Sequence, residues 1–392
     1  MPPVIVYITG FRQNAGKTVA SLGIISQLRK IMDPRRIGYF KPVGQELVTL
    51  PDGNRIDKDA VIISAFSGIP DLDLNAMSPV RLGSGFTREF LDSTDQEAEH
   101  LRLRARIEAT LRSLADKDVI VAEGTGHPGV GGIVGLSNAR VSNLMRADIV
   151  YLSGGGIGRA LDQLEVDLSY FLHMRSRVRG IIFNKVIPDK IDMLRQYITE
   201  PLLNRHFEAV GGPIRILGFL PEIDVLGRPS MNQIARAWKG ARLLGSVDDD
   251  AWRVPVHDIK ILSTPEADLR RSRFLLSGDV LVMSTAHQRR ARTLLRFHKR
   301  LLESTGQGLG GLILTGGSYV RLDNAVTWDI IKAGFPAIYV QEHTAIAEQK
   351  LLDVYDGAKL QPYDKGKMAD IERLFEQHFD LQKFLETLDI RP

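Results

Sequence analysis

The segment GFRQNAGKT, residues 10–18, has the residue types and spacing of a phosphate-binding loop. It directly follows the apolar run PVIVYITG and directly precedes a helical pattern; in that context backbone N–H groups and a helix N-terminus surround an anion. We expect Lys17 to reach the outer phosphates of a nucleotide and the Thr18 hydroxyl to ligate Mg²⁺. The predicted loop contacts are completed by Gly10, Asn14, Ala15, Gly16 and Val19. The alternative is an ordinary strand-to-helix turn that contains Gly-Lys-Thr.

Two charged residues that stand where apolar runs end could act on the same phosphates. Lys41 follows the run RRIGYF, and an ammonium group beside a phosphate loop can stabilise developing charge. Glu123 ends the run DVIVAE, at the edge where α/β sheets bind ligands, and is placed for Mg²⁺ or for a bridging water. We therefore predict Lys17, Lys41 and Glu123 as catalytic residues. A solvated lysine that precedes a turn is the alternative for Lys41.

A parallel sheet would position these residues. Short apolar runs, rich in β-branched residues and nearly continuous, alternate with longer helical patterns, the first of which spans residues 17–31. Strands that are covered on both faces have this pattern, so we predict an α/β fold in which helices flank a parallel sheet of the P-loop NTPase type. The predicted strands are residues 3–10, 35–43, 118–124, 147–156, 178–186 and 215–221.

A second, smaller α/β domain is predicted after a change in composition. The segment SVDDDAWRVP, residues 246–255, is acidic, ends in proline and is typical of a linker between a first domain, 1–245, and a second domain, 256–370. The closing segment DKGKMADIERLFEQHFDLQKFLETLDI, residues 364–390, has apolar spacings of three and four, which predict an amphipathic helix or pair of helices. We place the helical tail at 371–392. Four more predicted strands lie in HDIKILS, DVLVMST, GGLILTGG and PAIYVQE.

The composition of the 392-residue chain bounds the class of protein. The formal net charge of +4 does not indicate a nucleic-acid binder, and the absence of cysteine excludes disulfides, thiolate metal sites and a cysteine nucleophile. No apolar run approaches the roughly 20 residues of a membrane helix, and the N-terminus has no basic region of the kind that opens a signal peptide. We therefore expect a cytoplasmic enzyme or regulator that binds no membrane.

Together, these motifs resemble those of dethiobiotin synthetase and its relatives, which include cobyrinic acid a,c-diamide synthase and the N-terminal P-loop domain of long phosphotransacetylases. The usual loop has four residues before Gly-Lys, whereas this family has five, as do residues 11–15 here. The resemblance implies that Lys41, in a Lys-Pro pair, faces a substrate carbamate and phosphate. It also implies ATP and Mg²⁺ as cofactors.

The same resemblance implies a set of metal ligands. Asp59, with Asp57 as the substitute, corresponds to an aspartate that helps to hold the metal together with Thr18 and Glu123. Glu123 opens the segment EGTG, which matches the family's Glu-Gly-x-Gly. Because aspartates in a first helical turn are common on dipole grounds alone, helix capping is the alternative for both aspartates.

The residues that would hold the base come from the ends of the fifth and sixth runs. The resemblance implies that Asn184 binds the adenine. An Asn side chain can donate one hydrogen bond to the adenine edge and accept another from it. Pro221 and Glu222 would lie around the base or ribose. The alternatives are that Asn184 caps its strand and that Pro221 merely terminates one. The loop 154–156 is implied to shape the substrate side, and Arg159 prevents it from matching a dinucleotide fingerprint.

The second domain resembles the DRTGG domain, which follows the P-loop domain in phosphotransacetylases. Of the naming motif, Thr315, Gly316 and Gly317 are present, and they could form an anion-binding nest or a tight turn. Two functions follow: a nucleotide-responsive ATPase or regulatory module, or an ATP-dependent C–N ligase that phosphorylates a carbamate or carboxylate. The second substrate would be a small molecule. Because relatives place ligand sites at dimer interfaces, we expect a homo-oligomer.

Overall fold

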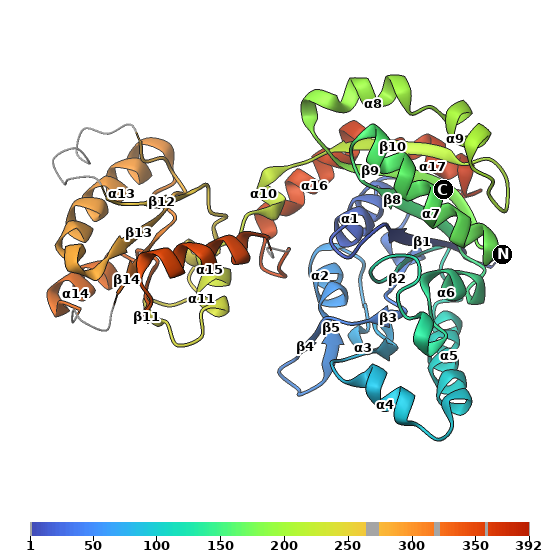
Figure 1. Ribbon diagram of the computed structural model, residues 1–392, viewed down its shortest axis with the longest axis horizontal. Coiled ribbons are helices and arrows are strands. Elements are labelled where there is room, and N and C mark those ends of the chain that lie inside the picture. The colour runs from blue at the N-terminus through green and yellow to red at the C-terminus, as the bar shows by residue number, and fades with distance from the viewer. Residues whose placement is uncertain (1, 264–273, 317–321, 357–359, 392) are drawn as a thin grey trace. The chain divides into compact units, whose positions relative to one another are not determined.

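The computed structural model describes residues 2–263, 274–316, 322–356 and 360–391. The chain forms two compact units (Figure 1). Met1–Glu222 and Lys365–Pro392 make up the first unit, and Ile223–Asp364 make up the second. The second unit is therefore an insertion into the chain of the first.

A six-stranded parallel sheet forms the centre of the first unit, in the order β10-β9-β8-β1-β7-β2. Every residue of β7 and β8 is buried, as the continuous apolar runs require of strands covered on both faces. The predicted parallel sheet is confirmed, and each of its six predicted strands is present. Their bounds are β1 Val4–Gly10, β2 Ile37–Phe40, β7 Val119–Glu123, β8 Asp148–Ser153, β9 Arg177–Val186 and β10 Arg215–Pro221.

Helices and two short ladders complete the first unit between these strands. The ladders pair β3 (Val43–Gly44) with β6 (Val80–Arg81) and β4 (Leu47–Thr49) with β5 (Arg55–Asp57). The helices of this part of the chain are α1 Lys17–Leu28, α2 Lys58–Phe66, α3 Leu74–Met77, α4 Phe86–Asp92, α5 Gln96–Ser113, α6 Asn138–Leu144, α7 Ile157–His173, α8 Ile191–Tyr197 and α9 Glu200–His206.

The closing segment forms the predicted pair of helices, α16 (Lys365–His378) and α17 (Leu381–Thr387). Both belong to the first unit, because α16 packs against α1 and β10 while α17 packs against β9 and β10. A Cβ atom added to Gly23 of α1 would lie 2.1 Å from a ring carbon of Phe375, so α1 and α16 approach closely at this glycine. This return of the chain differs from the predicted boundary at residue 370.

The second unit has a mixed five-stranded sheet in the order β11-β15-β14-β13-β12, in which β11 pairs antiparallel with β15 and the other three pairings are parallel. The four strands predicted here are present, and β11 was not predicted. The strands are β11 Arg242–Leu244, β12 Ile259–Ile261, β13 Val280–Ser284, β14 Gly311–Thr315 and β15 Ala337–Tyr339. The helices include α10 Asp224–Gly227, α11 Met231–Ala237, α13 Ala291–Thr305, α14 Asn324–Lys332 and α15 Thr344–Asp356.

The segment 246–255, predicted as a linker, is packed into the second unit. Trp252 is 1% exposed and belongs to a core cluster with Trp238 and Val282, and Asn232 donates a hydrogen bond to the Val247 carbonyl over 2.6 Å. The segment therefore contributes to the core of the inserted unit.

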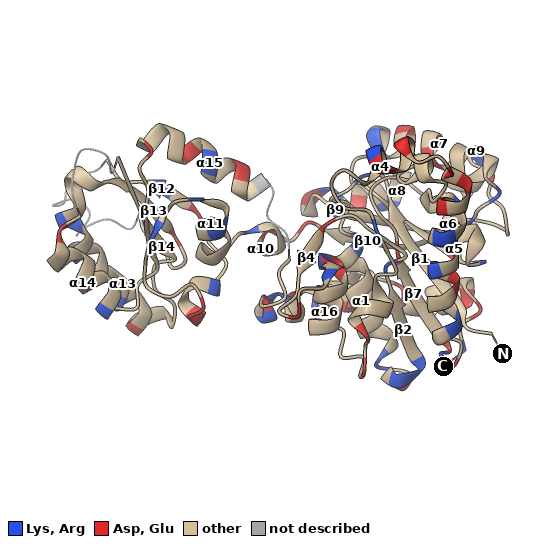
Figure 2. Ribbon diagram, turned by 90° about the horizontal axis from the view of Figure 1, so that it is seen from below, with Lys and Arg blue, Asp and Glu red and all other residues tan. Residues whose placement is uncertain are grey.

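Basic residues predominate on α13, whereas α15 carries both acidic and basic residues (Figure 2). Arg292 of α13 pairs with Asp329 of the neighbouring helix α14 over 2.7 Å. Among the described residues, no helix combines the length and hydropathy that crossing a membrane requires.

The glycine motif of the second unit is partly described. Thr315 ends β14, and its hydroxyl lies 2.8 Å from the Thr344 hydroxyl. Gly316 has a φ of 78°, which favours glycine, and donates its N–H to the Glu342 carbonyl over 2.6 Å. This bond joins the segment after β14 to the segment after β15. Gly317 lies outside the described residues.

Candidate nucleotide site

The loop between β1 and α1 has a backbone that only glycine accommodates at its last position. Gly16 is the N-cap of α1 with a φ of 92°, and a Cβ atom there would lie 2.4 Å from Nδ2 of Asn184. The same Nδ2 donates a hydrogen bond to the Ala15 carbonyl over 2.8 Å. The Asn184 side chain is therefore packed against the phosphate loop at Ala15 and Gly16. Helix α1 begins at the next residue, Lys17.

The ammonium group of Lys17 lies within this loop. It donates to the Arg12 carbonyl over 2.9 Å and to the Gly126 carbonyl over 3.1 Å, and the residue is 7% exposed. Lys17 thereby joins the loop after β1 to the loop after β7. Phosphate oxygens, which are stronger acceptors for an ammonium group than carbonyls, would compete with these contacts.

Glu123, at the carboxyl end of β7, collects hydroxyl donors from two elements. Thr18 Oγ1 donates to Oε1 over 3.0 Å, whereas Ser21 Oγ and Tyr39 Oη donate to Oε2 over 3.2 and 3.1 Å. Burial raises the pKa of Glu123 to about 7; Lys41 opposes this shift and Asp59 adds to it. Its carboxyl group therefore gains and loses a proton near neutral pH.

Lys41 lies among three carboxylates directly beside Thr18 and Glu123. Its Nζ contacts Asp59, lies 3.3 Å from Glu123 Oε1 and 3.4 Å from Asp57 Oδ1, and its side chain is 5% exposed. Burial acts to lower the pKa of Lys41, but the carboxylates, Asp59 first, hold it well above the usual value. The side chain is therefore a buried ammonium group and not the solvated lysine of the alternative interpretation.

The two aspartates have different roles. Asp57 is the N-cap of α2: its carboxylate accepts the backbone N–H groups of Asp59 and Gln45, both over 2.9 Å. Burial raises the pKa of Asp57. Burial also acts to raise the pKa of Asp59, but the Lys41 charge lowers it below the usual value. Asp57 thus matches the capping alternative, and Asp59 holds the ammonium group.

The donor chemistry at this point suits magnesium. Thr18, Asp59 and Glu123 would offer hydroxyl and carboxylate oxygens, which are the ligands that Mg²⁺ prefers. As the described side chains lie, no group of three or more His, Asp or Glu residues is arranged to hold a metal ion. The Lys41 ammonium group stands between the carboxylates instead.

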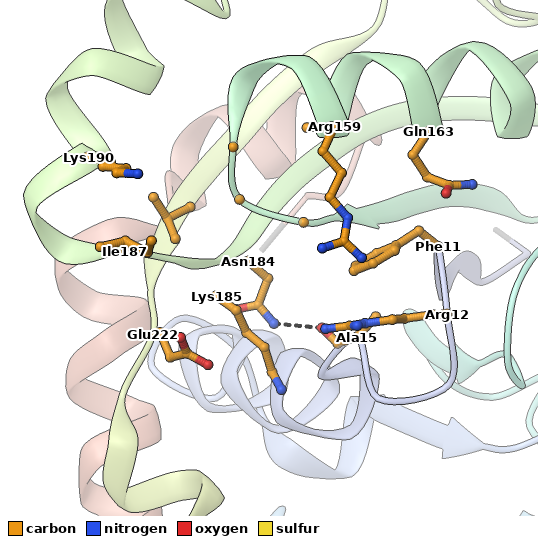
Figure 3. A pocket seen from close by; sticks show the side chains of 15 residues that line it. Phe11, Arg12, Ala15, Arg159, Gln163, Asn184, Lys185, Ile187, Lys190 and Glu222 are labelled. Carbon is orange, nitrogen blue, oxygen red and sulfur yellow. Dashed lines mark hydrogen bonds between the residues drawn. The ribbon is translucent and has the colours of Figure 1, made fainter. Parts of the chain in front are cut away.

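A pocket of about 300 Å³ lies on the other side of the phosphate loop (Figure 3). Asn184, which is 6% exposed, and Glu222 line it, as does Ala15 of the loop. Pro221 ends β10 and is not among the lining residues. The remaining lining residues are Phe11, Arg12, Gly154, Gly155, Gly156, Arg159, Ala160, Gln163, Lys185, Val186, Ile187 and Lys190.

The glycine loop 154–156 lines the same pocket as Asn184, on the side of β1 away from Lys41 and Glu123. The sheet order explains this position, since β8 lies between β1 and β9 while β7 and β2 lie beyond the other edge of β1. The loop after β8 therefore lines the pocket of Asn184, whereas Lys41 and Glu123 follow strands on the opposite side.

Sequence reasoning missed Asn138, which fixes the loop after β7. Its Oδ1 accepts from Tyr7 Oη over 2.8 Å and from the Thr125 N–H over 3.0 Å, and its Nδ2 donates to the His127 carbonyl over 2.7 Å. This loop contains Gly126, the acceptor of Lys17. An Asn that opens an α-helix has no local pattern that would mark it as a ligand of a loop.

The glycine loop after β1, the helix that follows it and the strand-end carboxylate in a parallel sheet define a P-loop NTPase. The chain belongs to the AAA_26 family, whose description is "AAA domain", with residues 5–230 matching that family. Nucleotide binding is what membership of this family implies. Among solved structures, a ParA family ATPase from Chlorobium tepidum TLS is similar at 17% identity and a TM-score of 0.30, over 57% of this chain and 85% of that chain.

Proposed function

We propose that the protein is an Mg·ATP-dependent ATPase that signals its nucleotide state to the inserted second unit. The observation that carries this proposal is the position of the two chain connections to the second unit: the first follows a residue that lines the pocket, and the second leads into a helix that packs on α1. Glu222 lines the pocket and is the last residue before the insertion. The chain returns at Lys365 into α16, which packs on α1, the helix that begins with Lys17. We also retain the DRTGG-like assignment of the second unit as a proposal.

Different residues of the first unit would bind the phosphates, the base and the metal ion of Mg·ATP. Lys17 would bind the outer phosphates, and Asn184 would hold the base. Thr18, Asp59 and Glu123 would hold Mg²⁺, which when bound neutralises charge on phosphate oxygens. Lys41 would place its buried ammonium group against the transferred phosphoryl group, where charge develops.

A second candidate function, an ATP-dependent C–N ligase, is favoured by the position of Lys41. In dethiobiotin synthetase the corresponding lysine faces a carbamate. A substrate carboxylate or carbamate oxygen would attack the γ-phosphorus and release ADP. A nitrogen nucleophile would then attack the activated carbon, release phosphate and lose its proton. Lys41 could stabilise the charge in both steps.

A spin-label distance measurement tests the signalling proposal, and the absence of native cysteine allows clean labelling. Asp192→Cys in the first unit and Lys299→Cys in the second replace side chains that are 97% and 77% exposed. Mg·ATP should change the distance distribution between these labels, and Lys17→Ala should abolish the change. A pair within the first unit, Asp192→Cys with Arg102→Cys, is the control. If saturating Mg·ATP does not change the distance distribution between the two labels, the signalling proposal is refuted.

Turnover separates the two candidate functions. ADP release is measured for the protein alone and with candidate diamines plus bicarbonate. ADP release that is independent of these compounds supports the ATPase. Release that requires a diamine and disappears in Lys41→Ala supports the ligase. Calorimetric ATP affinity that is unchanged in Lys17→Ala would contradict the site shared by both proposals.

A further inference from the structure

The pocket beside the phosphate loop is unusually cationic for a site that receives a nucleoside. Arg12, Arg159, Lys185 and Lys190 line it, and Glu222 is the one acidic lining residue. Within the part of the chain that the structure describes, none of the four cations has a carboxylate at ion-pair distance. Among the described residues, the single carboxylate of Glu222 therefore offsets only part of their positive charge.

These cations come from separate elements that meet at the pocket. Arg12 belongs to the phosphate loop, Arg159 to the first turn of α7 and Lys185 to β9, and Lys190 ends the short helical turn Pro188–Lys190. Figure 3 shows Arg159 extending from α7 towards Phe11, over whose ring Arg12 lies 4.9 Å from the centroid. Burial lowers the pKa of Lys185; Glu222 opposes this shift and Arg12 adds to it. An anion between these groups would relieve their mutual repulsion.

The remaining walls of the pocket suit a nucleoside. Phe11 and Ile187 are apolar, and the buried Asn184 has no hydrogen-bond partner for its Oδ1 among the described residues. A volume of about 300 Å³ is at the lower end of small-molecule sites. The base and ribose are uncharged, and the 5′-phosphates have the loop amides and Lys17. The four cations therefore exceed what ATP requires on this side.

We propose that this pocket recognises nucleotides that carry a further phosphate on the ribose in addition to the 5′-polyphosphate. Arg159 and Arg12 would bind this phosphate through their forked guanidinium groups, which match phosphate oxygens in pairs. Lys185 and Lys190 would supply additional positive charge. The inference rests on the proposed nucleotide binding and specifies the ligand class of that site.

Calorimetric titration with three compounds tests the inference: ADP, adenosine 2′-phosphate 5′-diphosphate and adenosine 3′-phosphate 5′-diphosphate. At least one of the two ribose-phosphorylated compounds should bind about tenfold more tightly than ADP, a gain of about 1.4 kcal/mol. The double variant Arg159→Gln/Lys190→Gln should bring the ratio of the affinities close to one. The matched control Arg140→Gln, an exposed arginine on α6, should leave the ratio as in the wild type.

The outcomes distinguish recognition of a ribose phosphate from nucleotide binding at this site, on which the inference rests. If ADP binds and neither ribose phosphate increases the affinity, the inference is overturned while nucleotide binding stands. A gain that survives in the double variant also overturns it, because the phosphate would then be bound elsewhere. If none of the three compounds binds, the proposed nucleotide site itself fails.

Discussion

Lys41 and Glu123 lie side by side in a buried ion pair because their strands are neighbours in register. Phe40 of β2 pairs with Ala122 of β7 in the parallel sheet, so Lys41, which follows β2, and Glu123, which ends β7, stand at the same edge. The Lys41 Nζ is 3.3 Å from Glu123 Oε1 as a result. Sheet register thus assembles an ammonium group and a carboxylate that are 82 residues apart in the sequence.

Replacing Lys41 by methionine should strongly destabilise the first unit. The variant keeps the length of the side chain but leaves Asp57, Asp59 and Glu123 without their cation. Breaking a buried ion pair from one side costs about 3–5 kcal/mol. Urea unfolding measures the loss. Lys30→Met is the control, because Lys30 and its partner Glu376 are exposed and such a pair contributes about 0–1 kcal/mol. Equal losses in the two variants would contradict the interpretation.

The pKa of Glu123 predicts a pH-dependent stability. Folding raises this pKa from 4.5 to about 7, so the folded state binds the proton more tightly than the unfolded state. The favourable contribution is full below pH 4.5 and is lost as the pH rises towards 7, a change of about 3 kcal/mol.

Glu123→Gln, which does not titrate, should therefore gain stability relative to wild type between pH 4.5 and pH 7.5. The free energy of unfolding of both proteins is measured by urea at several pH values in this range. The difference between them is the readout, since other titrating groups contribute to both curves. A difference that stays constant with pH would show that Glu123 has no raised pKa.

Local sequence patterns were sufficient for the main sheet and for much of the site. The apolar runs predicted all six strands, and a glycine loop between a strand and a helix predicted where Lys17 and Thr18 lie. Long-range packing was not accessible in this way. The acidic, proline-ended segment 246–255 has the composition of a linker, yet Trp252 is buried by residues distant in sequence. β11 has three residues, two of them exposed, which is too short for any periodicity.

Asn184→Ala should weaken nucleotide binding about tenfold and destabilise the fold by about 1 kcal/mol. The Ala15 carbonyl loses its donor, so the phosphate loop is held less firmly, and the base loses its proposed partner. Asn204→Ala is the matched control, since Asn204 exchanges two hydrogen bonds with the Ile214 backbone and does not line the pocket. Calorimetric ATP titration should show a loss for Asn184→Ala alone. Wild-type affinity in Asn184→Ala would remove this residue from the site.

Gly23→Ala should destabilise the first unit through a single methyl group. The new Cβ would lie 2.1 Å from the Phe375 ring, so α16 must shift away from α1, at a cost of about 1–3 kcal/mol for overpacking. Gly158→Ala is the control, because this helical glycine has nothing within 4 Å of its Cβ position. Alanine there should be neutral or stabilising by up to about 1 kcal/mol.

A double-mutant cycle shows whether the Phe375 ring is the cause of the effect of Gly23→Ala. Phe375→Ala removes the obstructing ring, so adding Gly23→Ala in that background should cost little. The two substitutions should therefore be non-additive by at least about 1 kcal/mol in urea unfolding.

Because α1 begins at Lys17, the shifted contact between α1 and α16 should also change the ATP-dependent label distances between the units, whereas Gly158→Ala should not change them. Strict additivity in unfolding would mean that the methyl group is accommodated without moving α16.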